Sequence, residues 1–280
     1  MRPSVWTSAL VELEPEEAAE RLARIGWRCL ELSDEHMRRV AGRELAGGAA
    51  RALKELCGKL KVEVPQAHGP MFNCCEDDKL EEHLELTEEV LKLAGILGIR
   101  WVVLHPGSAS VAEDDDALEY VRRRNLEVFR RLSDVAEEAG VGIALENMND
   151  GERPGRRTFG STPPELLWLV GNLGPGAGIC WDTGHAHLQR LDQRRALRAL
   201  GKHLVATHIA DNDGSGDQHL FPFEGKVDWK GVMEGLKEAG YSGPFNLEVP
   251  GETKVPLPVR EAKLRYGLEL AEAMAEGKVP

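Results

Sequence analysis

The stretch Val141-Gly-Ile-Ala-Leu-Glu146 is a short apolar run that ends directly in a carboxylate. The same arrangement recurs in Ala177-Gly-Ile-Cys-Trp-Asp182, in Leu204-Val-Ala-Thr-His208 and in Phe245-Asn-Leu-Glu248. Each run is typical of a buried strand, so each polar residue is expected where a strand ends. In a barrel of parallel strands those ends meet on one face. The pattern therefore predicts an α/β fold, a single (β/α)8 TIM barrel, with Glu146, Asp182, His208 and Glu248 at one mouth.

The rest of the chain extends this pattern, because strand-like and helix-like segments alternate throughout and indicate right-handed βαβ units. Most strand-like runs are rich in Val, Ile and Leu without alternation, as expected for strands covered on both faces. Proline opens the helices at Pro15 and Pro163, and glycine closes others at Gly98 and Gly240. Eight strands are predicted, over Ser4–Thr7, Arg28–Leu32, Lys61–Pro65, Arg100–Leu104, Gly142–Leu145, Gly178–Trp181, Leu204–Thr207 and Pro244–Leu247.

Length and cysteine content fit one intracellular domain. A chain of 280 residues is a usual size for such a barrel, so one domain over residues 1–280 is expected. The five cysteines are an odd number and include no Cys-x-x-Cys pair, which indicates a reducing cytoplasm. The sequence near Met1 has no apolar segment long enough for a signal peptide or a membrane span. We therefore expect an unprocessed cytoplasmic protein without a membrane partner.

Charge and loop length bear on the partner. The formal net charge of −12 disfavours a general nucleic-acid-binding surface, although clustered basic loops could still bind nucleic acid locally. The segments after the fifth and seventh strands, Asn147–Ser161 and Ala210–Val227, are long and rich in Gly, Pro and Asp. Long loops at the strand ends are where barrel enzymes place substrate contacts. A small-molecule partner is expected, and a homo-oligomer stays open.

The candidate ligands combine carboxylate oxygens with an imidazole nitrogen, which suits Mn²⁺, Mg²⁺, Co²⁺ or Zn²⁺ and gives no support to a thiolate site. A single histidine at a strand end is more often a helix cap or a satisfied polar contact than a ligand. Burying many such groups together would be costly without a cation. We predict one divalent metal ion, Mn²⁺ first, and expect five further residues as additional metal or substrate ligands: His68, His105, His185, Asp217 and His219.

Several residues beyond these nine candidates also have an expected role or place. Glu31 is expected either to hold the substrate or a ligand histidine, or to form an ion pair inside the barrel mouth. His187 is interpreted as an exposed helix residue rather than a donor to the site. Three aromatic residues are candidate walls of the site: Trp6, Phe72 and Trp181. Three histidines are interpreted as surface residues: His36, His83 and His203.

Four motifs carry a family resemblance: Leu145-Glu-Asn, Trp181-Asp-Thr-Gly-His-Ala-His, Thr207-His-Ile-Ala-Asp-Asn-Asp and Leu247-Glu-Val. With them the chain resembles the xylose isomerase-like TIM barrel superfamily over almost its whole length. That superfamily contains sugar isomerases and epimerases and the endonuclease IV group of abasic-site nucleases. The resemblance implies that Glu146, Asp182, His208 and Glu248 bind one divalent metal. It also implies that the two glutamates exchange protons with substrate.

The resemblance also implies an alternative, because the endonuclease group binds three zinc ions with nine ligands. The matching positions are all filled here, by His68, His105, Glu146, Asp182, His185, His208, Asp217, His219 and Glu248. Glu146-Asn-Met-Asn-Asp-Gly looks more like the sugar-enzyme branch, and Asp211–Gly216 has no basic residue that would suit DNA. It also lacks the arginine that ketose epimerases often carry there to hold substrate hydroxyls.

We therefore expect a divalent-metal-dependent isomerase or epimerase that acts on a sugar or related polyol carbonyl compound through an enediolate. Glu146 and Glu248 would move the proton, since a metal beside the carbonyl makes that proton acidic enough for a carboxylate to remove. The alternative is a zinc-dependent abasic-site endonuclease similar to endonuclease IV. A barrel that binds a sugar without chemistry is a third interpretation, and the intact glutamate pair argues against it.

Overall fold

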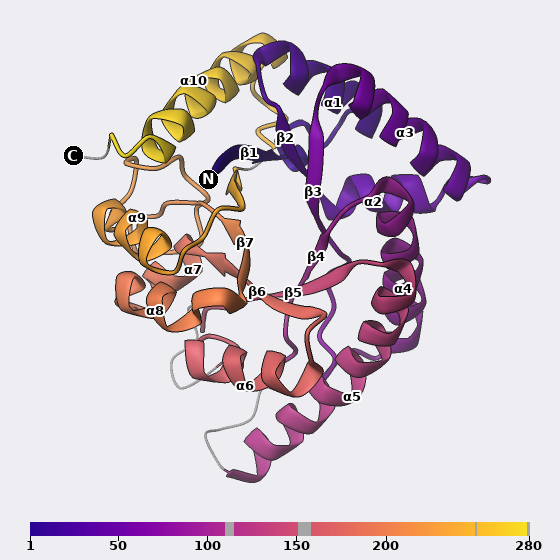
Figure 1. The fold of residues 1–280 in the computed structure, drawn as a ribbon, viewed down its shortest axis with the longest axis vertical. Coiled ribbons are helices and arrows are strands. Elements are labelled where there is room, and N and C mark those ends of the chain that lie inside the picture. Colours follow the sequence, from indigo (N-terminus) through magenta and orange to yellow (C-terminus); the bar gives the residue numbers. More distant parts are fainter. Residues whose placement is uncertain (110–114, 151–157, 250, 279–280) are drawn as a thin grey trace.

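The computed structural model describes residues 1–109, 115–150, 158–249 and 251–278. Eight parallel strands form one sheet in the order β7-β6-β5-β4-β3-β2-β1-β8. They lie at the centre of the molecule, and the helices surround them (Figure 1). The strands are β1 (Arg2–Trp6), β2 (Cys29–Leu32), β3 (Glu63–His68), β4 (Trp101–Leu104), β5 (Gly142–Glu146), β6 (Ala177–Asp182), β7 (Leu204–His208) and β8 (Pro244–Leu247).

The barrel is nearly closed between β7 and β8, the two strands at the ends of the sheet order. Ile209, just past β7, forms a parallel bridge with Leu247. Its amide donates to the Asn246 carbonyl at 2.8 Å, and its carbonyl accepts from the Glu248 amide at 3.0 Å. The fold is therefore the single (β/α)8 TIM barrel that the alternating pattern predicted.

Helices connect the strands and cover the outside of the barrel. They are η1 (Thr7–Leu10), α1 (Pro15–Ile25), α2 (Asp34–Ala41), α3 (Ala46–Leu60), α4 (Leu80–Leu97), α5 (Asp115–Ala139), α6 (Pro163–Leu173), α7 (Thr183–Leu188), α8 (Gln193–Leu200), η2 (Gly201–His203), α9 (Trp229–Glu238) and α10 (Leu257–Ala275). Pro15 and Pro163 occupy the first turns of α1 and α6, as predicted. No helix in the described part of the chain is both long and apolar enough to span a membrane.

All eight predicted strands are present, and β3 differs most from its predicted range. It starts at Glu63 rather than Lys61 and continues to His68. The reason is local, because Lys61 has a left-handed backbone (φ 56°) and caps α3 through its amide. The chain becomes extended only after that cap. His68 is consequently the last residue of a strand, where its side chain direction is set by the sheet.

The alternation of side chains along the strands decides which residues enter the barrel. Val103, Ala144, Cys180 and Ala206 form a separate buried cluster, with one residue from each of β4 to β7. Successive residues of a strand point to opposite faces, so the residue two positions later faces the same way. Those residues are His105, Glu146, Asp182 and His208. Small side chains thus fill the barrel interior below, and polar ones stand above them at the mouth.

Candidate metal centre

Four of the predicted ligands meet at the carboxyl end of the barrel. Glu146, Asp182, His208 and Glu248 each offer one ligand atom, and these atoms lie within 4.8 Å of one another. All four residues are buried. They come from β5, β6, β7 and the residue after β8, so consecutive strands place them side by side. The register confirms the juxtaposition, because Asp182 pairs with His208 across β6 and β7.

Glu146 lies at the centre of the cluster. Its Oε2 atom is 3.1 Å from His105 Nε2 and 3.1 Å from His208 Nδ1. Its Oε1 atom is 3.4 Å from His185 Nδ1. Burial opposes ionisation, but the interactions with His208 and His105 lower the pKa of Glu146 well below its usual range. Glu146 is therefore an ionised carboxylate surrounded by imidazoles.

Asp182 ends β6 and also caps α7. Its Oδ1 atom accepts the His185 amide, while its backbone is held by Asn147. Asn147 Nδ2 donates to the Asp182 carbonyl at 2.9 Å, and Asn147 Oδ1 accepts from the Asp182 amide at 2.6 Å. Oδ1 is used in the helix cap, whereas the buried Oδ2 atom has no hydrogen-bond partner among the described residues.

His208 is fully buried and lies between carboxylates. Its Nε2 atom hydrogen-bonds to Glu31 Oε1 at 3.0 Å, and its Nδ1 atom lies 3.5 Å from Glu248 Oε2. Burial disfavours the charged ring, but the neighbouring carboxylates outweigh this and raise the pKa of His208 well above its usual value. The structure shows both expected roles of Glu31, because its contact with the candidate ligand His208 is also an ion pair, at 3.0 Å.

Glu248 has the opposite electrostatic environment from Glu146. Burial raises the pKa of its carboxyl to about 8, against the attraction of His208 and His219. Its Oε2 atom is 3.6 Å from His219 Nδ1, and the Glu248 carbonyl accepts a hydrogen bond from that ring at 3.2 Å. The two glutamates therefore face one site from different strands and have pKa values shifted in opposite directions.

The residues fit a divalent cation. Within the described residues, three ligand candidates carry a buried polar atom without a hydrogen-bond partner: Asp182 Oδ2, His208 Nδ1 and Glu248 Oε2. Such atoms are rare in protein interiors because they lose their hydration without replacement. Carboxylate oxygens and an imidazole nitrogen are the ligands that Mn²⁺, Co²⁺ and Zn²⁺ accept. A cation placed among these atoms would satisfy all three.

A second group of potential ligands shares Glu146. His68, His105 and Glu146 also form a cluster that could hold a metal ion. His68 Nε2 lies 3.2 Å from His105 Nε2, and its Nδ1 atom hydrogen-bonds to the Gly69 carbonyl at 2.8 Å. Burial lowers the pKa of His105, whereas Glu146 overcomes burial and raises that of His68 to about 9.

A third group at the barrel mouth consists of three side chains in a row, with Asp217 between His185 and His219. Asp217 Oδ2 lies 3.1 Å from His185 Nε2 and 3.3 Å from His219 Nε2. The side chains of Asp217 and His219 are 32% and 24% exposed, so they lie nearer to solvent than the four central ligands. The structure thus brings all nine predicted site residues to one barrel mouth.

Some expectations for the surrounding residues were wrong. His36 is fully buried rather than on the surface, because its ring bonds to Thr7 Oγ1 at 2.8 Å and to the Leu13 carbonyl at 3.1 Å. Trp181 is not a wall of the site. It alternates with Asp182, so it faces the outer helices, where its Nε1 donates to Gln193 at 3.1 Å.

Trp6 does lie beside a site residue, with its ring centroid 6.2 Å from that of His68. Phe72 is half-buried and packs against the outer apolar core. His187 is half-buried and bonds to Asn212 at 2.8 Å. Sequence reasoning missed Asn147 and Asn246; the only sequence signal was their position next to, or two residues before, a predicted ligand glutamate.

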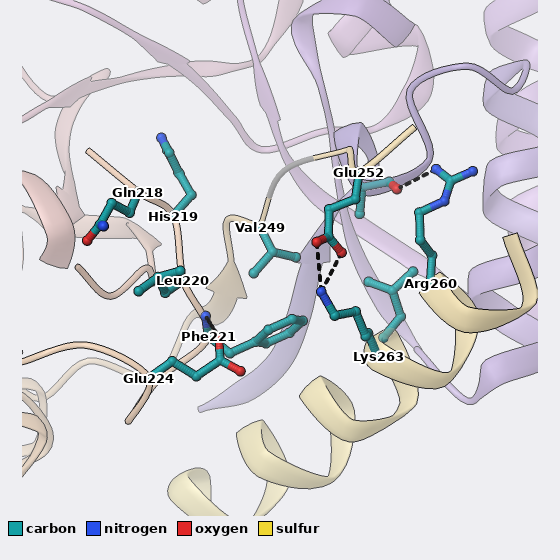
Figure 2. A pocket seen from close by; sticks show the side chains of 11 residues that line it. Gln218, His219, Leu220, Phe221, Glu224, Val249, Glu252, Arg260 and Lys263 are labelled. Carbon is teal, nitrogen blue, oxygen red and sulfur yellow. Dashed lines mark hydrogen bonds and ion pairs between the residues drawn. The ribbon is translucent and has the colours of Figure 1, made fainter. Parts of the chain in front are cut away.

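A pocket of about 170 Å³ adjoins the cluster. Its lining includes His219 and Val249 on one side and Arg260 and Lys263 of α10 on the other (Figure 2). Lys263 donates to both carboxylate oxygens of Glu252 at 2.7 Å. Arg260 is paired as well, with Glu12. The positive charges of Lys263 and Arg260 are therefore each already paired with a carboxylate.

Comparisons with known proteins agree with this architecture. A family model for the xylose isomerase-like TIM barrel matches residues 19–274. The uncharacterized protein y4fM of Sinorhizobium fredii is 30% identical over 216 residues, which cover 73% of this chain and 65% of that protein, just under two thirds of its length. The L-ribulose-5-phosphate 3-epimerase UlaE of Escherichia coli is 27% identical over 267 residues, or 95% of this chain and 86% of that protein.

Among solved structures, a D-tagatose 3-epimerase-like protein shares the fold with a TM-score of 0.78 and 23% identity, over 100% of both chains. The family match runs from α1 to α10 and includes every strand end that carries a candidate ligand. The chain therefore belongs to the xylose isomerase-like TIM barrel family.

Proposed function

We propose that this protein is a divalent-metal-dependent isomerase or epimerase of a sugar or related polyol carbonyl compound. The observation that carries the proposal is the pair of buried glutamates, Glu146 and Glu248, which face one ligand cluster from β5 and from the end of β8. The relatives named as a ribulose-5-phosphate epimerase and a tagatose epimerase-like protein support a sugar substrate. A role in carbohydrate metabolism in the cytoplasm is part of the proposal.

Glu146, Asp182, His208 and Glu248 would hold the metal ion, with Mn²⁺ as the first candidate. When bound, the divalent cation supplies positive charge that stabilises the enediolate formed as a proton leaves the carbon beside a carbonyl. Without such stabilisation the proton is too weakly acidic for a carboxylate to remove. The three unpartnered buried atoms of this set support the assignment.

The glutamates would move the proton. One carboxylate takes it from the carbon beside the carbonyl, and the other returns a proton to the enediolate. Return to the same carbon from the opposite side gives an epimer. Return to the former carbonyl carbon, with the hydroxyl proton passing from one substrate oxygen to the other, gives an aldose–ketose isomer. His185 would contact a substrate oxygen through Nε2 in place of its present bond to Asp217 at 3.1 Å, because its Nδ1 atom is bonded to the Asn147 carbonyl.

Solvent deuterium tests the proposal. The protein would be incubated with Mn²⁺ or Co²⁺ in D₂O and offered a panel of ketoses, aldoses and inososes. Enediolate chemistry should place deuterium on a carbon beside the carbonyl of at least one compound, because the proton held on a glutamate exchanges with solvent. Product formation is measured in parallel, since direct internal return of the proton would hide exchange. If no compound of the panel shows either deuterium exchange or product, the result contradicts the proposal.

The second candidate is a zinc-dependent abasic-site endonuclease. Two groups of side chains favour it: the cluster of His68, His105 and Glu146, and the row of His185, Asp217 and His219. Together they supply enough ligands for more than one zinc ion. Duplex DNA with one abasic site and Zn²⁺ is the test substrate. Efficient incision 5′ to that site, together with no exchange in D₂O, would replace the isomerase by the nuclease.

A further inference from the structure

Glu31 is a fully buried carboxylate at the inner surface of the barrel, below the ligand cluster. It lies on β2, three positions away from β7 around the barrel, yet its Oε1 atom accepts a hydrogen bond from His208 Nε2 at 3.0 Å. Its Oε2 atom accepts from Gln66 Nε2 at 2.9 Å and from Asn246 Nδ2. Both carboxylate oxygens are therefore occupied by donors.

The partners of Glu31 are themselves anchored. Ser4 Oγ donates to Asn246 Oδ1 at 2.9 Å, and Gln66 lies on β3 with its side chain amide also 3.4 Å from the Thr207 carbonyl. Among the described residues, no lysine or arginine is within hydrogen-bond or ion-pair distance of Glu31. Its one ionisable partner among these residues is the His208 ring, so that contact is what offsets the cost of burying the carboxylate.

We propose that Glu31 is a positioning residue that keeps the proton of His208 on Nε2 and so presents Nδ1 as the ligand atom for the divalent cation. This inference rests on the proposed metal-dependent function. The acceptor at 3.0 Å favours the protonated Nε2, and the Nδ1 atom faces Glu146 Oε2 at 3.1 Å and Glu248 Oε2 at 3.5 Å. Histidines that bind metals commonly donate their other N–H to a carboxylate, which fixes the ring and strengthens it as a ligand.

The geometry also explains why the acceptor is a carboxylate rather than an amide. A glutamine at position 31 would turn an NH₂ group toward one of its present donors, either toward His208 or toward Gln66 and Asn246. The His208 ring would then lose either its acceptor or its fixed orientation. Removing the negative charge would also weaken the electrostatic attraction of the site for a cation.

Cation affinity distinguishes positioning from a purely structural role. Mn²⁺ and Co²⁺ dissociation constants are measured for wild type, Glu31→Gln and a matched control, Ser4→Ala, which removes the outermost hydrogen bond of the network and keeps the Glu31–His208 contact. Glu31→Gln should bind each ion about 10- to 100-fold more weakly, the usual effect of losing such a partner. Ser4→Ala should stay close to wild type. Equal affinities of wild type and Glu31→Gln would overturn the inference.

A measurement on the wild-type protein keeps the inference testable even where Glu31→Gln fails to fold. With ¹⁵N-labelled histidine and Zn²⁺, NMR should show the His208 proton on Nε2, with His208→Gln used to assign the signal. A proton on Nδ1 would overturn the inference. If the proposed metal-dependent function is wrong, the result is different, because the wild-type protein itself then binds neither Mn²⁺, Co²⁺ nor Zn²⁺.

Discussion

The side chain of Asn147 bonds to both backbone polar groups of Asp182. Its Nδ2 atom donates to the Asp182 carbonyl at 2.9 Å, and its Oδ1 atom accepts from the Asp182 amide at 2.6 Å. Both residues are fully buried, so these bonds have no competition from water. The Asn147 carbonyl also accepts from His185 Nδ1 at 2.8 Å. One residue on the chain after β5 therefore sets the positions of two side chains on β6 and α7. This arrangement leads to the first prediction.

Replacing Asn147 by alanine should loosen Asp182. Both backbone groups of Asp182 that Asn147 satisfies would lose their partners, a cost of about 1–3 kcal/mol for each buried group. We expect about 10- to 100-fold weaker binding of Mn²⁺, measured by titration calorimetry. Asn172→Ala is the control, since its side chain bonds to the Trp168 carbonyl at an exposed position on α6. Unchanged affinity in Asn147→Ala would show that Asp182 does not need this support.

The two glutamates should be needed for turnover and not for folding. Glu146→Gln and Glu248→Gln keep the volume of the side chain and remove the group that transfers the proton. We expect kcat to fall by about 10²- to 10⁴-fold in each variant, with an unchanged circular dichroism spectrum. Glu252→Gln, which affects only the exposed pair with Lys263, should keep its activity. Near-normal rates in either active-site variant would remove the two-carboxylate mechanism.

Asp182→Asn and His208→Ala should lose metal before anything else. Asp182 would keep its capping oxygen for the His185 amide but lose the charge that attracts a cation. His208→Ala removes the imidazole donor entirely. Metal content after purification with Mn²⁺, measured by plasma mass spectrometry, should fall below the wild-type level in both. If both variants kept the wild-type content, the ligand assignment would be wrong.

The number of metal ions separates the two candidate enzymes. We expect about one equivalent per chain, with His68, His105, Asp217 and His219 acting mainly on substrate or on neighbouring ligands. Asp217→Asn should accordingly lower kcat/KM while metal content stays near one, because Asp217 contacts His185 and His219 rather than the central ligands. Crystals grown with Zn²⁺ give the direct count by anomalous scattering. Three zinc ions at the barrel mouth would contradict this prediction and favour the nuclease.

The loop that carries Asp217 and His219 should depend on Gly225. A Cβ atom there would lie 2.3 Å from Asp211 Oδ1 and 2.4 Å from the Asn212 carbonyl oxygen. Gly225→Ala should therefore lower the free energy of unfolding by about 1–3 kcal/mol. Gly171→Ala on α6 is the matched control, because its Cβ would meet nothing within 4 Å and should stabilise the helix by about 0.5–1 kcal/mol. Thermal unfolding of both variants tests the pair.

The sequence was informative about the site where the signal was local. Glu146 follows a run of buried residues, and the same is true of Asp182, so both strand ends could be recognised from a few neighbouring residues. Alternation within β6 also contained the answer for Trp181, since a residue next to an inward-facing aspartate must face outward. Trp181 accordingly packs in the apolar core outside the barrel and not at the site.

His36 could not have been placed in this way. Its partners are Thr7, the first residue of η1, and Leu13 before α1. They come next to it only when β1 and β2 pair and α2 packs against them. A polar residue on a helix is usually exposed, and nothing in the residues around His36 marks it as the exception.

By itself the sequence determined the eight strands, their parallel arrangement and the face on which the candidate ligands gather, because these follow from short apolar runs and from the period of side chains along a strand. Only the tertiary structure decided what each ligand touches. Glu31 reaches His208, and Asn147 holds Asp182, through barrel closure and strand register. Such contacts join residues far apart in the chain, where no local pattern records the pairing.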